Sequence, residues 1–258
     1  MQNLLQELIV GNLIAFMIVF MRFGIVLMLM PGIGDGFVSP QIRLLFALAV
    51  SFVITPVLAA SLPSPPASSG GLILLLLTEC MIGFFIGTIM RMMIFALDVA
   101  GNLASAQIGF SAATLFNPAT ESQGALLGAV YATLGVTILM AADLHHQLLA
   151  AIIESYRTYP AGGPMPDMGG MADTIGRIVT IAFRIGVLVV VPFLVVCTLI
   201  QMGFGVLGRL MPQLQIFFLA LPGQIFIGLL MLSLTMTAGV MYWLSGYEAV
   251  VLQTLVAD

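Results

Sequence analysis

The chain has 258 residues, of which 61% are hydrophobic and only 7% are charged; its seven cationic side chains are all arginines, against eleven acids. A typical soluble domain is about a quarter charged and under half apolar, so this composition excludes a soluble globular enzyme and a disordered protein. A net charge of −4 offers no basic surface to a phosphate backbone, which excludes a nucleic-acid binder. The composition therefore predicts an integral membrane protein.

Six apolar stretches are long enough, or nearly so, to cross a bilayer as helices of about 20 residues. They cover residues 8–30, 42–60, 72–97, 124–142, 178–201 and 214–244. Short links rich in proline and glycine separate most of them, and the longer link 143–177 contains an amphipathic segment at 144–159. We therefore predict one all-α membrane domain over residues 1–258, without a catalytic module. No basic segment precedes the first stretch, so it is not expected to be a cleaved signal peptide.

The arginines in the links do not orient these spans. With six spans, Arg157 and Arg177 fall on one side and Arg43 and Arg209 on the other. The positive-inside rule needs an imbalance between the two sides, and here there is none. This result indicates that some stretches are not ordinary, independently inserted spans.

Five ionisable residues lie within or at the edges of the apolar stretches, where each is costly and therefore a candidate functional group. One interpretation is an ion pair or a carbonyl-bonded arginine that fixes helix packing; the other is a proton or ion relay. The predominance of arginine favours packing, because a guanidinium keeps its charge while a relay needs groups that titrate. The five residues are Arg22, Arg43, Glu79, Arg91 and Arg184.

The third apolar stretch carries Glu79, Gly83, Gly87 and Arg91 at a constant spacing of four residues. On a helix they form one stripe, whose glycines allow a second backbone to approach closely. Glu79 and Arg91 would lie about 18 Å apart along the axis, too far to pair with each other. Gly124 and Gly128 repeat the pattern in the fourth stretch. The stripe predicts tight helix packing, within the chain or between subunits.

The segment of residues 100–118 is polar but carries no charge. It has two interpretations. The first is an extramembrane loop with a short surface helix. The second is a re-entrant or constriction element, because irregular backbone at membrane depth survives only when it is buried in protein or lines a cavity.

The sequence contains no recognisable catalytic or metal-binding set. His145 and His146 are adjacent and are expected to point to different sides of a helix, unlike a ligand pair spaced by four residues. Cys80 and Cys197 both lie inside apolar stretches, which fits neither a disulfide framework nor a metal site. We therefore expect no enzymatic activity, no cofactor and no metal.

Short motifs follow one another in order along the chain. They are Arg22-x-Gly24 with Pro31, Pro40-Gln41-Ile42-Arg43, Glu79 with Gly83 and Gly87, Ala100-Gly101, Gln107-x-Gly109-Phe110-Ser111, Asn117-Pro118, Gly208-Arg209-Leu210-Met211-Pro212-Gln213, Phe217 and Leu221-Pro222. As an ordered set they resemble the FliR family of flagellar biosynthetic proteins, the R subunits of the flagellar type III export gate. The resemblance runs from about Leu8 to Val250.

The resemblance implies a subunit of a protein-export channel in the bacterial inner membrane, at the flagellar basal body. It implies a P-like part over residues 1–177 and a Q-like C-terminal hairpin over residues 178–258, with long apolar helices in kinked hairpins. The implied partners are P and Q subunits in a helical ring, the export switch protein FlhB, the large gate protein FlhA, membrane lipid and unfolded flagellar export substrates.

The resemblance also assigns roles to particular residues. Residues 106–122 would plug the closed pore, through Gln107, Gly109, Phe110, Ser111, Phe116, Asn117 and Pro118. Subunit packing and assembly would depend on Arg22, Gly24, Pro40, Arg43, Glu79, Gly83, Gly87, Arg209, Pro212, Gln213 and Pro222.

Two alternatives remain at this point. Injectisome relatives usually carry an acid and an arginine after the Ala100-Gly101 motif, whereas residues 102–107 here are uncharged, which favours the flagellar branch. The competing class of protein is a secondary transporter or ion channel that uses intramembrane glutamate and arginine residues. Such a protein would act alone, whereas an export-gate subunit would act only with its partners.

Overall fold

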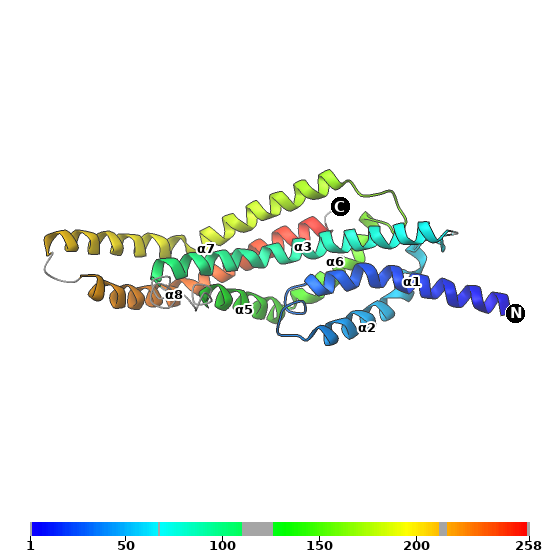
Figure 1. Cartoon of the computed structure of the whole chain (residues 1–258), viewed down its shortest axis with the longest axis horizontal. Helices are drawn as coiled ribbons and strands as arrows, with labels where there is room; N and C mark the ends of the chain where they lie inside the picture. The colour runs from blue at the N-terminus through cyan, green and yellow to red at the C-terminus, as the bar shows by residue number, and fades with distance from the viewer. Residues whose placement is uncertain (1, 67, 110–125, 212–215, 257–258) are drawn as a thin grey trace. The chain divides into compact units, whose positions relative to one another are not determined.

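The computed structural model describes residues 2–66, 68–109, 126–211 and 216–256, and over these ranges all regular structure is helical (Figure 1). The all-α prediction is therefore confirmed. The helices are α1 (Gln2–Leu29), α2 (Pro40–Leu58), the 3-10 turn η1 (Ala59–Ser61), α3 (Ser69–Ile108), α5 (Leu126–Ala141), α6 (Leu144–Thr158), α7 (Met168–Leu210), α8 (Ile216–Tyr247), the π-helical turn η3 (Glu248–Leu252) and α9 (Gln253–Val256).

Five helical stretches are long and apolar enough to cross a membrane, and they lie in α1, α2, α3, α7 and the region from α8 to α9. The pair α5 and α6 adds a sixth if it counts as one broken span. This number agrees with the predicted six apolar stretches. The predicted ends differ, however, because α3 runs on to Ile108 and α7 covers Met168–Leu210. The helix α3 continues through the polar segment 98–108, and α7 extends through glycine-containing segments at both ends, residues 168–177 and 202–210.

Local sequence explains where α2 begins and which face of α6 is buried. The Ser39 hydroxyl accepts a hydrogen bond from the Ile42 backbone N–H, and Pro40 occupies the first turn, where its missing N–H has no cost. The predicted amphipathic segment forms α6. Its buried residues recur every three or four positions, as expected for a helix with one face toward the protein interior; they are Leu144, Leu148, Ala151, Ile152, Ser155 and Tyr156.

The chain forms two compact units, each assembled from separate parts of the sequence. Unit 1 comprises residues 1–92, 139–178 and 249–258, and unit 2 comprises residues 93–138 and 179–248. One crossing between the units, at residues 178 and 179, falls next to the boundary expected between the P-like and Q-like parts. The similarity of these two parts to P and Q subunits remains a prediction.

In unit 1, α1 and α2 lie side by side (Figure 1), and α6 contacts α9. The N-terminal part of α3 packs on α1, with Gly83 of α3 against the backbone of Arg22. The core of this unit is therefore built from α1, α3 and α6, and the buried residues Phe23, Ile86 and Ile152 contribute to it.

In unit 2, glycines mark the places where helices approach closely. A Cβ atom on Gly101 of α3 would lie 2.4 Å from the backbone of Gly128 on α5, and one on Gly239 of α8 would lie 2.8 Å from Val189 on α7. The buried Trp243 indole donates a hydrogen bond of 2.7 Å to the Met93 carbonyl. Small residues at helix contacts are typical of packing between membrane helices, where backbones gain dispersion contacts by close approach.

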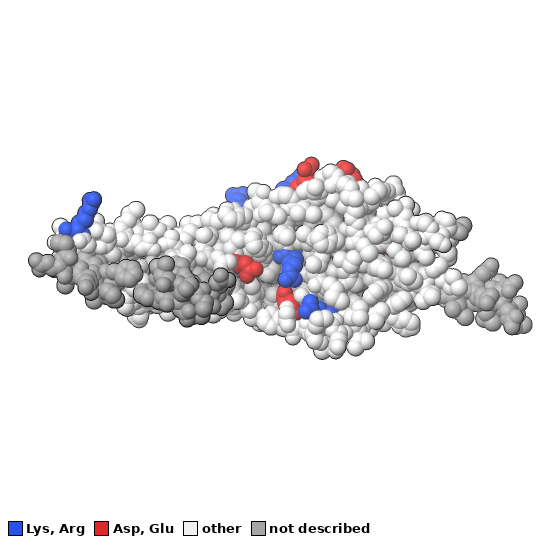
Figure 2. Space-filling view, in the orientation of Figure 1, with Lys and Arg blue, Asp and Glu red and all other residues white. Residues whose placement is uncertain are grey.

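Large apolar side chains nevertheless remain exposed along several helices. Phe52 on α2, Leu210 on α7 and Phe226 on α8 are each more than 70% exposed. Charged side chains are sparse on the face of the molecule shown in Figure 2. Apolar surface of this extent must be covered by lipid or by other protein subunits.

Candidate functional site

The ionisable centre of unit 1 is a buried pair between Arg22 of α1 and Glu79 of α3. The Arg22 Nε atom lies 2.7 Å from Glu79 Oε2, and Nη2 lies 3.0 Å from Glu79 Oε1. The two side chains are 0% and 1% exposed. Two parallel N–H···O bonds between a guanidinium and a carboxylate fix both the distance and the orientation of the groups. The pair therefore joins α1 to α3 at a defined register.

Residues from α6 and its C-terminal end complete the surroundings of Arg22. Its Nη1 atom donates to the Ser155 hydroxyl at 3.1 Å, and Nη2 donates to the Tyr159 carbonyl at 2.8 Å. The guanidinium carbon lies 3.8 Å from the centre of the Tyr156 ring, a cation–π contact. One buried arginine thus connects three segments of unit 1.

This arrangement favours a packing role for the pair. Four donations from Arg22 occupy most of the five N–H groups that a guanidinium offers, and each goes to protein. A proton relay needs a group that can release and regain its proton, which a bidentate arginine partner opposes. Sequence reasoning identified Arg22 and Glu79 but not Ser155, Tyr156 or Tyr159. The periodic pattern of the amphipathic α6 could have indicated that Ser155 and Tyr156 lie on its buried face.

The glycine stripe of α3 faces α1 of the same chain. A Cβ atom on Gly83 would lie 2.8 Å from the Arg22 backbone oxygen, and one on Gly87 would lie 2.8 Å from the Leu29 side chain. The close approach predicted from the four-residue spacing is therefore present, and it is intrachain. Glu79 binds Arg22 and not Arg91. This agrees with the prediction that Glu79 and Arg91 are too far apart along the helix to pair.

Two other predicted arginines hold the link between α1 and α2. Arg43 of α2 donates to the Val38 carbonyl at 2.9 Å and to the Gly34 carbonyl at 2.8 Å. This is the carbonyl-bonded arrangement that sequence reasoning offered as one interpretation. Arg91 of α3 lies 3.5 Å from the carboxylate of Asp35, and these side chains are partly exposed. The two arginines together fix the course of this link against α2 and α3.

The segment predicted as a loop or constriction begins as a helix. Residues 100–108 form the last turns of α3, with Ala100, Ala104 and Ile108 fully buried. This part is therefore a helix continuous with the rest of α3, with one face buried, and not a loop. Of its uncharged polar residues, Asn102 is exposed, Gln107 is half-buried and Ser105 is buried, and a hydroxyl is far less costly to bury than a charge.

Gln107, in the last turn of α3, is the predicted plug residue whose surroundings are best defined. The Gln201 side-chain amide of α7 donates to the Gln107 Oε1 atom at 3.0 Å and to its backbone oxygen at 3.3 Å. The Gln224 amide of α8 donates to the same backbone oxygen. Gly109 follows with a φ of 88°, a left-handed conformation common where a helix ends. Sequence reasoning missed Gln201 and Gln224 because it searched the apolar stretches for charges only.

The other predicted site residues lie apart from these clusters or outside the described residues. Gly24 is buried in α1, Pro40 begins α2, Arg209 is exposed in the last turn of α7, and Pro222 is exposed inside α8. Arg184, named for its place in an apolar stretch, is exposed on α7. The predicted residues outside the described ranges are Phe110, Ser111, Phe116, Asn117, Pro118, Pro212 and Gln213.

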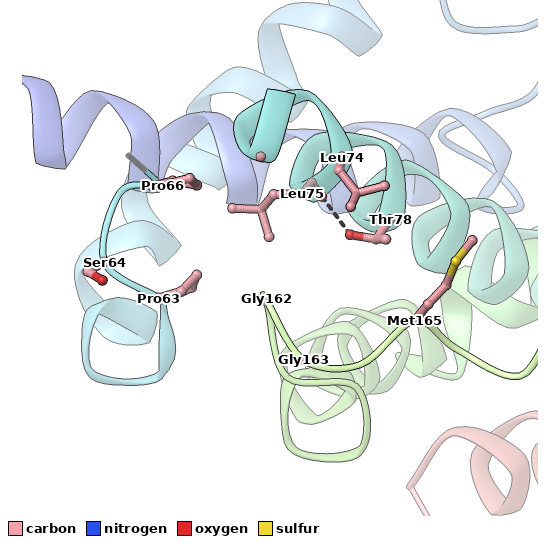
Figure 3. A pocket seen from close by; sticks show the side chains of 10 residues that line it. Pro63, Ser64, Pro66, Leu74, Leu75, Thr78, Gly162, Gly163 and Met165 are labelled. Atoms are coloured by element: carbon pink, nitrogen blue, oxygen red, sulfur yellow. Dashed lines mark hydrogen bonds between the residues drawn. The ribbon is translucent and has the colours of Figure 1, made fainter. Parts of the chain in front are cut away.

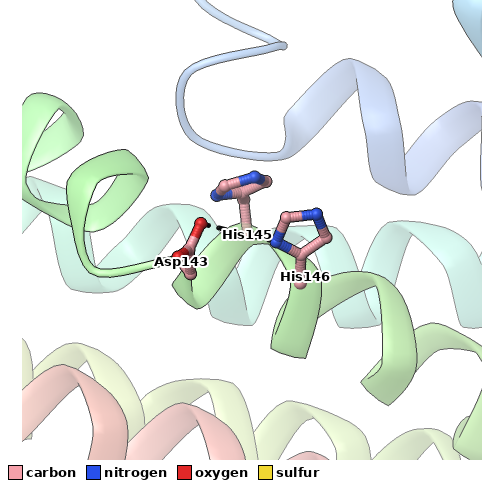
Figure 4. Close-up of side chains that lie close together, drawn as sticks. All are labelled: Asp143, His145 and His146. Atoms are coloured by element: carbon pink, nitrogen blue, oxygen red, sulfur yellow. Dashed lines mark ion pairs between the residues drawn. The ribbon is translucent and has the colours of Figure 1, made fainter.

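Figure 4 shows Asp143, His145 and His146 grouped at the start of α6. The prediction that the two histidines point to different sides is wrong, because their ring centroids are 4.1 Å apart. They occupy the first helical turn, directly after Asp143, whose φ of 56° turns the chain sharply. The three side chains could approach one metal ion. However, Asp143 and His146 are more than 70% exposed, and the positive end of a helix dipole disfavours a cation.

A cavity of about 350 Å³ lies in unit 1 beside the N-terminal part of α3 (Figure 3). Its walls come from the link before α3, from α3 itself and from the link before α7. Pro63, Leu74 and Met165 make it largely apolar. The Thr78 hydroxyl is bonded to the Leu75 carbonyl of its own helix at 2.7 Å. The cavity therefore lacks the convergent polar groups that fix a specific ligand.

The sequence profile of the family described as "Bacterial export proteins, family 1" matches residues 13–250. The chain belongs to this family. The match includes the whole or the larger part of every long helix, residues of both units and the Arg22–Glu79 pair. The family resemblance expected from the ordered motifs is therefore confirmed.

Several characterised relatives are similar over most of their length. The flagellar biosynthetic protein FliR of Caulobacter vibrioides is 34% identical over 231 residues, covering 90% of this chain and 92% of the relative. FliR of Bacillus subtilis is 28% identical, covering 86% of each chain. The Yop proteins translocation protein T of Yersinia pestis is 28% identical over 152 residues, or 58% of each chain.

Proposed function

We propose that this chain is the single-copy R subunit of the flagellar type III protein export gate. In this role it contributes to the membrane channel through which unfolded flagellar proteins leave the cell, and it has no catalytic step of its own. The observation that carries the proposal is the 34% identity with a FliR protein over 90% of the chain. The long apolar helices are consistent with a multi-pass membrane subunit.

The flagellar branch is favoured over the injectisome branch. The FliR proteins of Caulobacter vibrioides and Bacillus subtilis align with 90% and 86% of this chain, whereas the Yop translocation protein aligns with 58%. The uncharged residues 102–107 agree with this assignment. The corresponding location is the bacterial inner membrane, at the flagellar basal body.

The proposed partners are the P and Q subunits of a helical ring, with the export switch protein and the large gate protein beside them. The exposed apolar side chains of α2, α7 and α8 support an assembled state, because such surfaces gain free energy when another apolar surface covers them. Lipid would cover what the partners leave exposed. The P-like and Q-like parts would each contribute helices to this ring.

The site residues divide into two proposed roles. Residues 106–122 plug the closed pore, with side chains that are uncharged except for Glu121 and that exclude ions without binding a passing chain strongly. Arg22, Glu79, Gly83 and Gly87 support assembly through the fold of unit 1, because their side chains or close contacts lie inside the chain. Arg209, exposed at the end of α7, would act in direct contact with another subunit.

Co-purification tests the proposal. The tagged chain is expressed with the P and Q subunits of its own organism, extracted in mild detergent and analysed by native mass spectrometry. We expect one copy in a complex with both partners, and loss of motility when the gene is deleted. Arg209→Ala should weaken the complex without lowering the amount of the chain. A chain that purifies alone and drives ion uptake in vesicles would instead be a transporter.

A further inference from the structure

The C-terminal end of α3 lies against α7 and α8 within unit 2, and two side-chain amides converge on it. A helix leaves its last four carbonyls without partners in the helix, and in an apolar environment each must find another donor. The Gln107 carbonyl is one of these. It accepts hydrogen bonds from the Gln201 amide, at 3.3 Å, and from the Gln224 amide.

The three glutamines have mostly apolar neighbours in the sequence; Gln107 and Gln224 are half-buried and Gln201 is exposed. Gln201 ends the long apolar stretch of α7, and Gln224 follows Pro222 inside the apolar α8. A glutamine amide has two N–H groups, so Gln201 can donate to the Gln107 backbone oxygen and to its side-chain oxygen at 3.0 Å together. The position of the carbonyl is thus fixed by donors from two different helices.

Packing beside the amides adds a second constraint. A Cβ atom on Gly228 would lie 2.6 Å from the Ile108 side chain, so the backbone of α8 approaches the last residue of α3 closely. Gly109 follows in a left-handed conformation, and a Cβ atom there would lie 3.7 Å from the Gln224 amide. Hydrogen bonds to Gln107 and close packing against Ile108 therefore both hold the end of α3.

We infer that Gln201 and Gln224 are positioning residues that cap the C-terminal end of α3 and fix the point at which the chain leaves this helix. The cap itself does not depend on the proposed function, but its effect on the gate rests on that function. If the residues after α3 plug the pore, these two amides hold the base from which that segment starts. Loss of both donors frees the end of α3, and the closed gate then leaks.

Methionine substitutions test the cap, because methionine keeps the length of glutamine but has no N–H donor. The variants are Gln201→Met, Gln224→Met and the double variant, each in the complex with partner subunits. Gln147→Met, at an exposed position of α6, is the matched control.

Two measurements separate the cap from its consequence. Hydrogen–deuterium exchange of the peptide covering residues 102–109 should be roughly tenfold faster in the double variant, because loss of hydrogen bonds favours local opening. In each single variant one donor remains, so the logarithm of the increase in exchange rate should be less than half of its value in the double variant. Uptake of a small cationic dye by cells producing the double variant should rise.

The outcomes are distinct. Unchanged exchange at residues 102–109 in the double variant would overturn the cap, whatever the function of the protein. Faster exchange without dye uptake would overturn its link to the closed gate. Failure of the proposed function would instead appear in the unmodified protein, as absence of a complex with the P and Q subunits.

Discussion

Arg22 and Glu79, which are 57 residues apart in the sequence, form a two-point ion pair that is at most 1% exposed. The Ser155 hydroxyl and the Tyr159 carbonyl accept two further hydrogen bonds from the same guanidinium. Burying a charged pair costs desolvation energy, which the mutual attraction offsets only when the geometry is good and the other polar groups are satisfied. Here the geometry is good and Arg22 directs four hydrogen bonds to protein acceptors, so loss of either partner has a large effect.

We predict that Glu79→Leu destabilises unit 1 by about 3–5 kcal/mol, because it leaves the buried Arg22 charge without its carboxylate. The double variant Arg22→Met with Glu79→Leu should be less destabilised than Glu79→Leu alone, since no uncompensated charge remains. Arg22→Lys should fall between the normal chain and Glu79→Leu, because an ammonium cannot reproduce the planar donor fork. The thermal midpoint of the detergent-solubilised complex measures all three.

The double variant decides between charge and packing. If it is as unstable as the single Glu79 variant, the loss arises from the packing of the side chains and the Ser155 and Tyr159 bonds. The electrostatic explanation would then be wrong.

Gly83 provides a second test, because its Cβ position lies 2.8 Å from the Arg22 backbone oxygen. Gly83→Ala should destabilise the chain by about 1–3 kcal/mol, because the backbones of α1 and α3 must separate to accept the methyl group. Gly11→Ala in α1 is the matched control, since nothing lies within 4 Å of its Cβ position. That change should be neutral or slightly stabilising, because alanine favours a helix more than glycine does.

Equal effects of the two alanine substitutions, in the same thermal measurement, would show that helix propensity and not close packing governs both sites. A lower thermal midpoint for Gly83→Ala alone would assign the cost to the contact between α1 and α3.

The sequence predicted the helices better than it predicted their ends. Apolar stretches of about 20 residues have one stable solution in a bilayer, a helix, because every backbone group must be paired. The polar residues Asn102, Ser105 and Gln107 interrupted the apolar pattern and concealed the last turns of α3. A helix with one buried face tolerates such residues, because Asn102 is exposed and only Ser105 is fully buried, and that environment is not encoded in the local pattern.

For the candidate site, single residues were predictable but their partners were not. Glu79 and Arg22 were each identified by the cost of a charge in an apolar stretch. Their pairing depends on the register between α1 and α3, which close packing at Gly83 helps to set. Gln201 and Gln224 carry no charge, so they were overlooked, although a buried amide also needs a partner.

The proposed plug gives the most direct functional test. Replacing residues 110–122 with a glycine–serine linker of equal length leaves Gln107 and Gly109, which end α3, unchanged. A flexible, hydrated linker cannot form the compact and partly apolar constriction that excludes water and ions. We therefore expect cells with this variant to take up small dyes and ions that the normal cells exclude. The leak should vanish when a partner gate subunit is also deleted, because the channel then no longer forms. If the variant assembles with its partners and permeability stays unchanged, these residues do not plug the pore.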